Sequence, residues 1–288
     1  MSELRVVPEN IDRLEDIPFL PIAFFKTHDI KSGVWEAETT YRSSGTTGMT
    51  QSRHLVFSED EYLINSRKCF EHFFGPLKSY HFLALLPSYL EREGSSLISM
   101  IRYFIDESGS AQSGFFLRDH ERLRQQLDEL KNDRRRVVLW GVSFALLDLL
   151  EEGAIDLSGC LVFETGGMKG RRREITRQEL HETLKAGFNV PQIYSEYGMT
   201  ELFSQAYTIG GMTFKCPPQM KVIGRDPSDP MMRGLVDETA ALNVIDLSNW
   251  RTISFIETED LGRVYVDGSF EVQGRMDNSE IRGCNLLI

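Results

Sequence analysis

The chain has 288 residues, of which 41% are hydrophobic, and a formal net charge of −11 at pH 7. The length allows one large domain or a domain with a smaller lobe, and the acidic charge argues against a nucleic-acid partner, which requires a basic field. No apolar stretch approaches the roughly 20 residues of a membrane span, and the four scattered cysteines form no C-x-x-C pair, so structural zinc is not expected.

The first part of the chain is predicted to be an α/β body. The N-terminus lacks the basic-then-apolar pattern of a signal peptide, which predicts a cytoplasmic location. Pro18 and Pro21 fix an extended path through segment 17–25, so this apolar segment is expected to lie along the body as an arm. Strands then alternate with helices, which indicates a large, mostly parallel sheet covered by helices on both faces. The expected elements are a helix 58–74 opened by the capping box Ser58-Glu-Asp-Glu61, a strand 81–86, an amphipathic helix 119–130, a strand 137–140, a helix 144–150 capped by Ser143, a strand 161–163, and a helix from the capping box Thr176-Arg-Gln-Glu179 to about Ala186.

The pattern changes from about residue 210. Short strands joined by polar turns are expected at 241–247, 251–257, 262–266 and 269–272, and Asp267-Gly268 is a hairpin signal between the last two. We therefore expect two parts, a body at 1–209 and a small antiparallel β lobe at 210–288.

A loop rich in serine, threonine and glycine marks the candidate site. The segment is Tyr41-Arg-Ser-Ser-Gly-Thr-Thr-Gly48, in which glycine permits a close backbone approach and the hydroxyls are short donors. Such a loop can hold phosphate oxygens through many weak donors. It lacks the Gly-Lys-Ser/Thr ending of a Walker motif, and a polar surface turn is the alternative.

Four further motifs follow in a fixed order. They are Glu164-Thr-Gly-Gly-Met168, Tyr194-Ser-Glu-Tyr-Gly-Met-Thr-Glu201, Glu259-Asp-Leu-Gly-Arg263 and Gly274-Arg-Met-Asp277. With the hydroxyl-rich loop, this order resembles the adenylate-forming superfamily of acyl-CoA synthetases, nonribosomal adenylation domains and luciferases. Within it, Leu86-Pro-Ser-Tyr-Leu-Glu-Arg92 and Ser279-Glu-Ile-Arg-Gly-Cys-Asn285 are similar to the LuxE-like acyl-protein synthetases.

The resemblance implies a reaction and its participants. A fatty acid or another carboxylic acid would be activated with ATP and Mg²⁺ as an acyl-adenylate, and the acyl group would pass to a cysteine thiol. An acyl reductase or an acyl acceptor protein is the implied partner, and the mobile C-terminal domain of the superfamily is expected to be absent. The alternatives are a ligase for coenzyme A or an acyl carrier, and a nucleotide- or acyl-binding subunit without turnover.

The resemblance also assigns roles to residues. Glu201 matches the magnesium position and Thr200 the phosphate-facing hydroxyl, whereas a plain helix N-terminus would explain both residues without a ligand. Cys284 matches the acylated cysteine, and the alternative is that it packs as a small hydrophobe. The implied nucleotide-binding residues are Ser43, Ser44, Gly45, Thr46, Thr47, Gly48, Gly166 and Gly167 at the adenine-side turn, Tyr197 and Gly198 beside the base, and Asp260 and Arg275 at the ribose.

Two groups of basic residues need comment: one position differs from the family pattern, and one basic run is additional to it. The Pro-Lys that usually follows the hydroxyl-rich loop is replaced by Thr50-Gln51, which leaves Arg53 as the nearest cation. The basic run from Lys169 to Arg173 follows the Gly-Gly turn and could hold pyrophosphate or meet an acidic partner, or it could simply be solvated.

Overall fold

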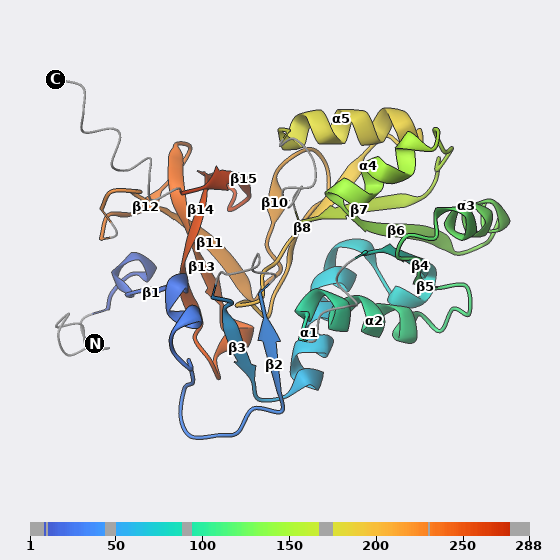
Figure 1. Cartoon of the computed structure of the whole chain (residues 1–288). Coiled ribbons are helices and arrows are strands. Elements are labelled where there is room, and N and C mark those ends of the chain that lie inside the picture. The colour runs from blue at the N-terminus through green and yellow to red at the C-terminus, as the bar shows by residue number, and fades with distance from the viewer. Residues whose placement is uncertain are drawn as a thin grey trace.

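A computed structural model describes residues 9, 11–43, 50–87, 94–166, 175–229 and 231–276. In these ranges thirteen strands form one large sheet, and a separate hairpin pairs β2 (Thr39–Arg42) with β3 (Arg53–Val56). Part of the large sheet is parallel and covered by helices and the rest is antiparallel (Figure 1), so the predicted mixed α/β fold is confirmed. Among the helices described, none has both the length and the apolar composition needed to cross a membrane.

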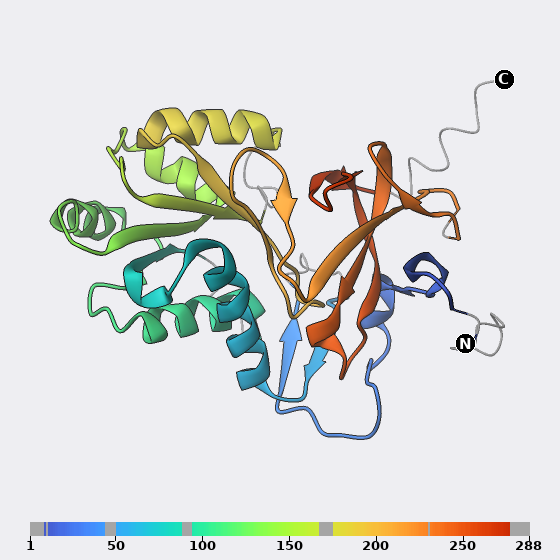
Figure 2. The same cartoon turned by 180° about the vertical axis from the view of Figure 1, so that it is seen from behind.

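The parallel part contains five neighbouring strands. Its order is β5-β4-β6-β7-β8, and every pairing within it is parallel. Two helices cover one face of these strands and two cover the other (Figures 1 and 2). The strands are β4 (Tyr80–Leu85), β5 (Gly114–Phe115), β6 (Arg136–Val142), β7 (Leu161–Thr165) and β8 (Ile193–Tyr197); α1 (Glu59–Phe74) and α2 (Ser96–Ser108) lie on one face, α4 (Ser143–Glu151) and α5 (Arg177–Phe188) lie on the other, and α3 (His120–Glu129) lies near the β5 edge.

Local sequence explains where most of these helices begin. The side chains of Ser58, Asp119 and Thr176 accept hydrogen bonds from the backbone three residues on, as N-caps do. Ser143 was expected to cap α4, and this expectation is wrong, because α4 begins at Ser143 itself and its hydroxyl bonds Glu164 and the Gly166 carbonyl instead.

The antiparallel part continues the same sheet. Its order from the far edge is β12-β11-β13-β14-β15-β10-β9, and β9 pairs with β8. The two strands expected at 251–257 and 262–266 are one strand, β14 (Phe255–Val264), with a bulge between Leu261 and Gly262, whereas the expected turn at Asp267-Gly268 is present. The remaining strands are β9 (Ala206–Thr208), β10 (Phe214–Lys215), β11 (Met220–Arg225), β12 (Arg233–Leu235), β13 (Thr239–Asp246) and β15 (Phe270–Arg275). Because one sheet joins both parts, the division at residue 210 stays a prediction.

The N-terminal segment packs on the antiparallel part. Two short helical turns, η2 (Leu14–Asp16) and η3 (Ile22–Lys26), flank β1 (Leu20–Pro21), which pairs in parallel with β14. The Phe25 side chain is fully buried in the same core as Tyr197, and its ring centroid lies 5.6 Å from that of His54. The arm is therefore part of the core and not a loose extension.

An aromatic core fills the α1 face of the parallel strands. The rings of Trp140 and Phe163 stack at 4.6 Å, and Phe70 of α1 packs against both. All three side chains are fully buried. Each such side chain contributes about 1.5–3 kcal/mol through burial, which fixes the strand ends that carry the candidate site.

Candidate active site

The base of the hydroxyl-rich loop is closed by two serines. The Ser52 backbone N–H donates to Ser43 Oγ at 2.9 Å, and the Ser43 N–H donates to the Ser52 carbonyl at 3.1 Å. The other predicted loop residues, Ser44, Gly45, Thr46, Thr47 and Gly48, lie outside the described residues. The loop therefore starts and ends at one point on the β2–β3 hairpin.

Glu201 lies beside that point. Its carboxylate is hydrogen-bonded to the Ser52 side chain, and only 5% of the residue is exposed. Burial raises the pKa of Glu201, while the Ser52 hydrogen bond and the positive charges of Arg275 and Lys26 lower it. The predicted magnesium residue is thus brought to the base of the predicted phosphate loop, although about 150 residues separate them in the sequence.

Two side chains hold the backbone on which Glu201 is mounted. His54 Nδ1 lies 2.7 Å from the Thr200 carbonyl, and Asn249 Nδ2 donates to the Glu201 carbonyl at 2.8 Å. Burial lowers the pKa of His54 to about 4, so at neutral pH the ring carries one N–H. Nε2 lies 3.1 Å from Asn249 Oδ1, and both this oxygen and the Thr200 carbonyl only accept, so the neutral ring donates to one of the two.

A second pair of side chains holds the far end of the same loop. Asp246 Oδ2 accepts hydrogen bonds from the backbone N–H groups of Phe203 and Ser204, both at 2.8 Å. Asn65 of α1 donates to the Phe203 carbonyl at 2.9 Å. The loop from Thr200 to Ser204 is therefore held by β3, α1, β13 and the short turn η5 (Leu247–Asn249), which presets its geometry before any ligand binds.

Three predicted nucleotide-binding residues meet in the antiparallel part. Tyr197 Oη donates to Asp260 Oδ2 at 2.8 Å, and Arg275 Nε lies 3.5 Å from Asp260 Oδ1. Asp260 and Arg275 are direct neighbours across β14 and β15. The Tyr197 ring is 8% exposed and packs against Phe214 and Phe270, so stacking of this ring on a base stays a prediction.

The predicted glycines lie at the ends of β7 and β8. Gly166 has a φ of +70° and follows β7 directly, a conformation that favours glycine. Gly198 follows β8, and a Cβ at this position would lie 2.1 Å from Glu196 Oε1. Gly167 and the basic run from Lys169 to Arg173 lie outside the described residues.

No protein-family model matches the sequence, and no curated protein matches it. Solved structures do match the fold. ATP-bound MatB from Rhodopseudomonas palustris gives a TM-score of 0.61 at 17% identity, over 85% of this chain and 49% of MatB. A 2-hydroxyisobutyryl-CoA ligase in complex with 2-HIB-AMP and CoA gives 0.67 at 15% identity, over 96% of this chain and 69% of the ligase.

A third match is the O-succinylbenzoate coenzyme A synthetase MenE from Bacillus subtilis, in complex with ATP and magnesium. It gives a TM-score of 0.57 at 17% identity, over 82% of this chain and 50% of MenE. The chain shares the fold of these enzymes. It spans about half the length of MatB and of MenE. The fold expected from the motif order is therefore confirmed, and the adenylate-forming activity and the LuxE-like branch stay predictions.

The positively charged residues near Glu201 differ from the expected one. Arg53 was the cation expected near the loop, and its guanidinium pairs with Asp29 at 3.0 Å. The charges that act on Glu201 belong to Arg275 and to Lys26 of the N-terminal arm. His54 was not predicted from the sequence; side chains alternate along β3, and His54 and Val56 are its buried positions.

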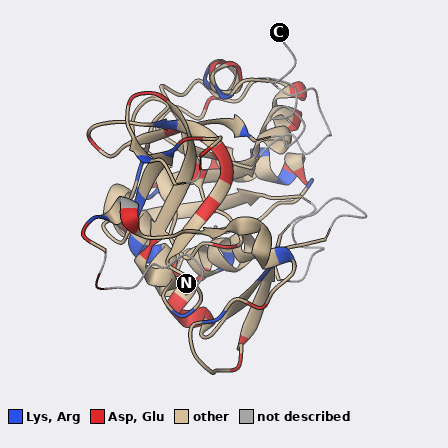
Figure 3. Ribbon diagram, turned by 90° about the vertical axis from the view of Figure 1, so that its left-hand side faces the viewer, with Lys and Arg blue, Asp and Glu red and all other residues tan. Residues whose placement is uncertain are grey.

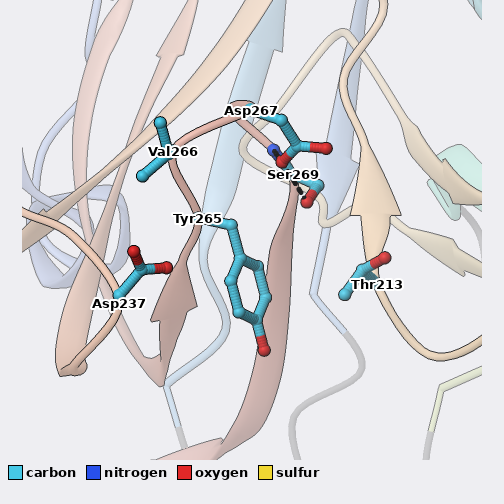
Figure 4. Close-up of a pocket in the computed structure, with 6 residues that line it drawn as sticks. All are labelled: Thr213, Asp237, Tyr265, Val266, Asp267 and Ser269. Carbon is cyan, nitrogen blue, oxygen red and sulfur yellow. Dashed lines mark hydrogen bonds between the residues drawn. The ribbon is translucent and has the colours of Figure 1, made fainter.

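Within the described residues, one surface pocket lies at Tyr265, and its lining does not suit a nucleotide. A shallow pocket of about 430 Å³ surrounds Tyr265, between Asp237 and Thr213 (Figure 4). Its two carboxylates, Asp237 and Asp267, would repel phosphate. The Asp267 carboxylate also accepts hydrogen bonds from the backbone N–H and the hydroxyl of Ser269 within the same turn. In the view of Figure 3, acidic and basic residues are interspersed along the described ribbon.

Proposed function

We propose that this chain uses ATP to activate a carboxylic acid as an acyl-adenylate and then transfers the acyl group to a thiol. The observation that carries the proposal is the position of the buried Glu201 carboxylate at the base of the hydroxyl-rich loop, where it bonds Ser52. The Asp260–Arg275 pair supports the proposal, because Arg275 pairs with Asp260 and its positive charge also lowers the pKa of Glu201.

The reaction requires positioning more than covalent chemistry. A carboxylate oxygen of the substrate attacks the α-phosphorus of ATP, the acyl–phosphate bond forms, and the bond to pyrophosphate breaks. The backbone and hydroxyl donors of the loop would hold phosphate oxygens, Asp260 would accept hydrogen bonds from the ribose hydroxyls, and Lys26 and Arg275 would offset the negative charge.

Glu201 fits the role of the magnesium ligand. In the ranges that the structure covers, no three metal-binding side chains converge. A single carboxylate agrees with the way Mg²⁺ is held in phosphate-transfer sites, by one or two carboxylates and the substrate phosphates. When bound, the ion would neutralise charge on the phosphate oxygens.

Cys284 is the proposed acceptor of the acyl group, with the LuxE-like resemblance as its support. Its thiolate would attack the acyl carbon, form the thioester and release AMP. Cys284 lies outside the described residues. The other three cysteines are poor nucleophiles, because burial raises the pKa of Cys69 and of Cys216 to about 12 and also raises the pKa of Cys160. From Cys284, the acyl group would pass to an acyl reductase or an acceptor protein.

Coenzyme A is the second candidate acceptor. The matched structures favour it, since two of them are a coenzyme A ligase and a coenzyme A synthetase. The two acceptors differ in a direct test, because the first predicts a protein-bound thioester without coenzyme A and the second requires coenzyme A.

The activation step is tested by acid-dependent exchange of pyrophosphate into ATP, over a panel of carboxylic acids. Exchange that depends on both the acid and Mg²⁺ supports the proposal. ATP binding without exchange for any acid would instead identify a nucleotide-binding subunit without turnover.

A further inference from the structure

A row of polar side chains lies on the α1 face of β8 and β9. Glu196 and Tyr207 are directly opposite each other in this antiparallel pair, so their side chains share a face. Gln205 directly precedes β9, and its Cγ lies beside Glu196 Oε1, 3.3 Å from the position that a Cβ on Gly198 would take. Thr165 of the neighbouring strand β7 donates to Glu196 Oε2 at 2.5 Å.

Two polar atoms in this row of side chains lack a hydrogen-bond partner among the described residues. Within the described residues, Tyr207 Oη and Gln205 Oε1 are buried and have no hydrogen-bond partner. Tyr207 is fully buried and Gln205 is 3% exposed. Each such atom costs about 1–3 kcal/mol when it is left unpaired. Two of them in neighbouring positions, beside a carboxylate, point to a group that completes them.

The row also lies close to the proposed reaction centre. Glu196 Oε1 lies over Gly198, at 2.1 Å from the position a Cβ would take. The Gly198 residue is exposed, and it stands two residues before Thr200. Because side chains alternate along a strand, Glu196 is on the opposite side of β8 from Tyr197 and its partner Asp260. A substrate beside Gly198 would therefore meet Glu196 on the side away from the ribose-binding residues.

The hydrophobic core next to Glu196, Gln205 and Tyr207 is filled by aromatic side chains. Phe70, Trp140 and Phe163 are fully buried, and the ring centroid of Tyr207 lies 6.1–6.3 Å from those of all three. A long hydrocarbon chain on this face would have to displace these rings. It would also leave Glu196, Gln205 and Tyr207 without polar partners.

We propose that Glu196, Gln205 and Tyr207 form a substrate subsite that binds a hydroxyl or amino group on a short carboxylic acid. The inference rests on the proposed acid-activating function and assigns its substrate class. Glu196 Oε1 and Gln205 Oε1 are acceptors, and Tyr207 Oη can donate or accept, so the complementary group is one that donates at least one hydrogen bond. Burial raises the pKa of Glu196 to about 7, and a bound donor or ammonium group would favour its ionised form.

The test compares matched acids in the exchange assay. Butanoate, 4-hydroxybutanoate, 4-aminobutanoate and dodecanoate are offered to the full-length protein. We expect kcat/KM for the hydroxy or amino acid to exceed that for butanoate by about 10-fold or more, since buried polar groups reject a substrate that leaves them unpaired. Dodecanoate is expected to be the poorest substrate.

Variants show whether the row causes the preference. Tyr207→Phe and Gln205→Met keep the shape of the side chains and remove the unpaired atoms, so the preference should fall to about 3-fold or less. Tyr194→Phe, on the same face of β8, is the matched control and should keep it. A wild-type protein that uses butanoate or dodecanoate as well as the substituted acids would overturn the subsite, and so would a preference retained in Tyr207→Phe.

A binding readout separates this proposal from the activation chemistry. If no acid supports exchange, the activation proposal fails, and the shift in Tm caused by each acid then decides the subsite. Stabilisation by the substituted acids that is lost in Tyr207→Phe supports it. Equal shifts for substituted and unsubstituted acids, or no shift with any acid, would overturn it.

Discussion

Tyr197 Oη donates a hydrogen bond of 2.8 Å to Asp260 Oδ2, and this contact joins two strands that are not neighbours in the sheet. Tyr197 ends β8 and Asp260 lies in β14, and β9, β10 and β15 stand between them in the strand order. In a flat sheet four strand spacings would separate the two backbones by about 19 Å, which these side chains cannot span. The sheet must therefore curl, and Phe214 and Phe270 fill the inside of the curl against the Tyr197 ring.

Tyr197→Phe should weaken this closure without removing the ring. The variant loses a hydrogen bond to a buried carboxylate, so the free energy of unfolding should fall by about 1.5–3 kcal/mol in denaturant titrations. Tyr265→Phe, at the surface pocket, is the matched control and should change it by less than about 0.5 kcal/mol. Equal stability of the two variants would show that the Tyr197–Asp260 bond contributes nothing.

Glu201→Gln should abolish most of the acid-dependent exchange. The amide keeps the size of the side chain and removes the negative charge proposed to hold Mg²⁺, so we expect a loss of about 100-fold or more. Glu107→Gln, on the exposed side of α2, should keep wild-type exchange. A folded Glu201→Gln protein with full activity and an unchanged Mg²⁺ requirement would contradict the assignment.

His54→Leu should raise the Mg²⁺ concentration needed for half-maximal exchange by about 10-fold, because His54 orients the backbone of Thr200 and Glu201. Asn65→Leu is the comparison, since Asn65 holds the same loop at Phe203, away from the carboxylate. Both variants should lose stability, but only the first should change the Mg²⁺ requirement. The same Mg²⁺ dependence in both would reduce His54 to a structural role.

Much of the parallel part of the fold can be predicted from the sequence, whereas few of the contacts that hold the residues of the candidate site can. The caps at Ser58 and Thr176 and the buried runs of β4, β6 and β7 are local signals, and local signals can be read without a structure. Helix α2 was not predicted, although its sequence carries local signals: Ser95 is its N-cap, and the buried Ile98, Ile101 and Phe104 recur at intervals of three residues.

The side chains that hold the backbone on either side of Glu201 come from segments that are distant from it in the sequence. His54 lies 146 residues from Thr200, and Asp246 lies 42 residues from Ser204. Neither pair has a spacing that a local pattern could reveal. The curl of the sheet likewise follows from the pairing of β10 with β15, which the order of strands along the chain does not fix.

The carboxyl of Glu196 should make stability depend on pH. Burial raises its pKa from 4.5 to about 7, the Thr165 hydrogen bond acts in the opposite direction, and the charge of Glu164 adds to the rise. The folded state therefore holds a proton that the unfolded chain releases. The stabilisation is fully present below about pH 4.5 and is lost as the pH rises through about 7.

The comparison of wild type with Glu196→Gln isolates this effect, because the amide does not titrate. Between pH 5 and pH 8 the wild type should lose about 2–3 kcal/mol of unfolding free energy relative to the variant. Denaturant titrations at several pH values measure the difference. Parallel pH profiles for the two proteins would mean that Glu196 titrates at its ordinary value.

Cys284→Ser should separate activation from acyl transfer. The variant keeps the residues proposed for adenylation, so it should still exchange pyrophosphate into ATP at about the wild-type rate, yet it should carry no hydroxylamine-labile acyl label. Serine is a poor substitute here, because its hydroxyl lacks the thiolate character that attack on the acyl-adenylate requires. Cys69→Ser, Cys160→Ser and Cys216→Ser are the matched controls and should label normally, since burial raises the pKa of each of these thiols. Labelling that persists in Cys284→Ser, or that disappears in one of the controls, would assign the acceptor to another cysteine. Exchange without labelling in any of the proteins, and thioester formation only when coenzyme A is added, would establish the coenzyme A ligase instead.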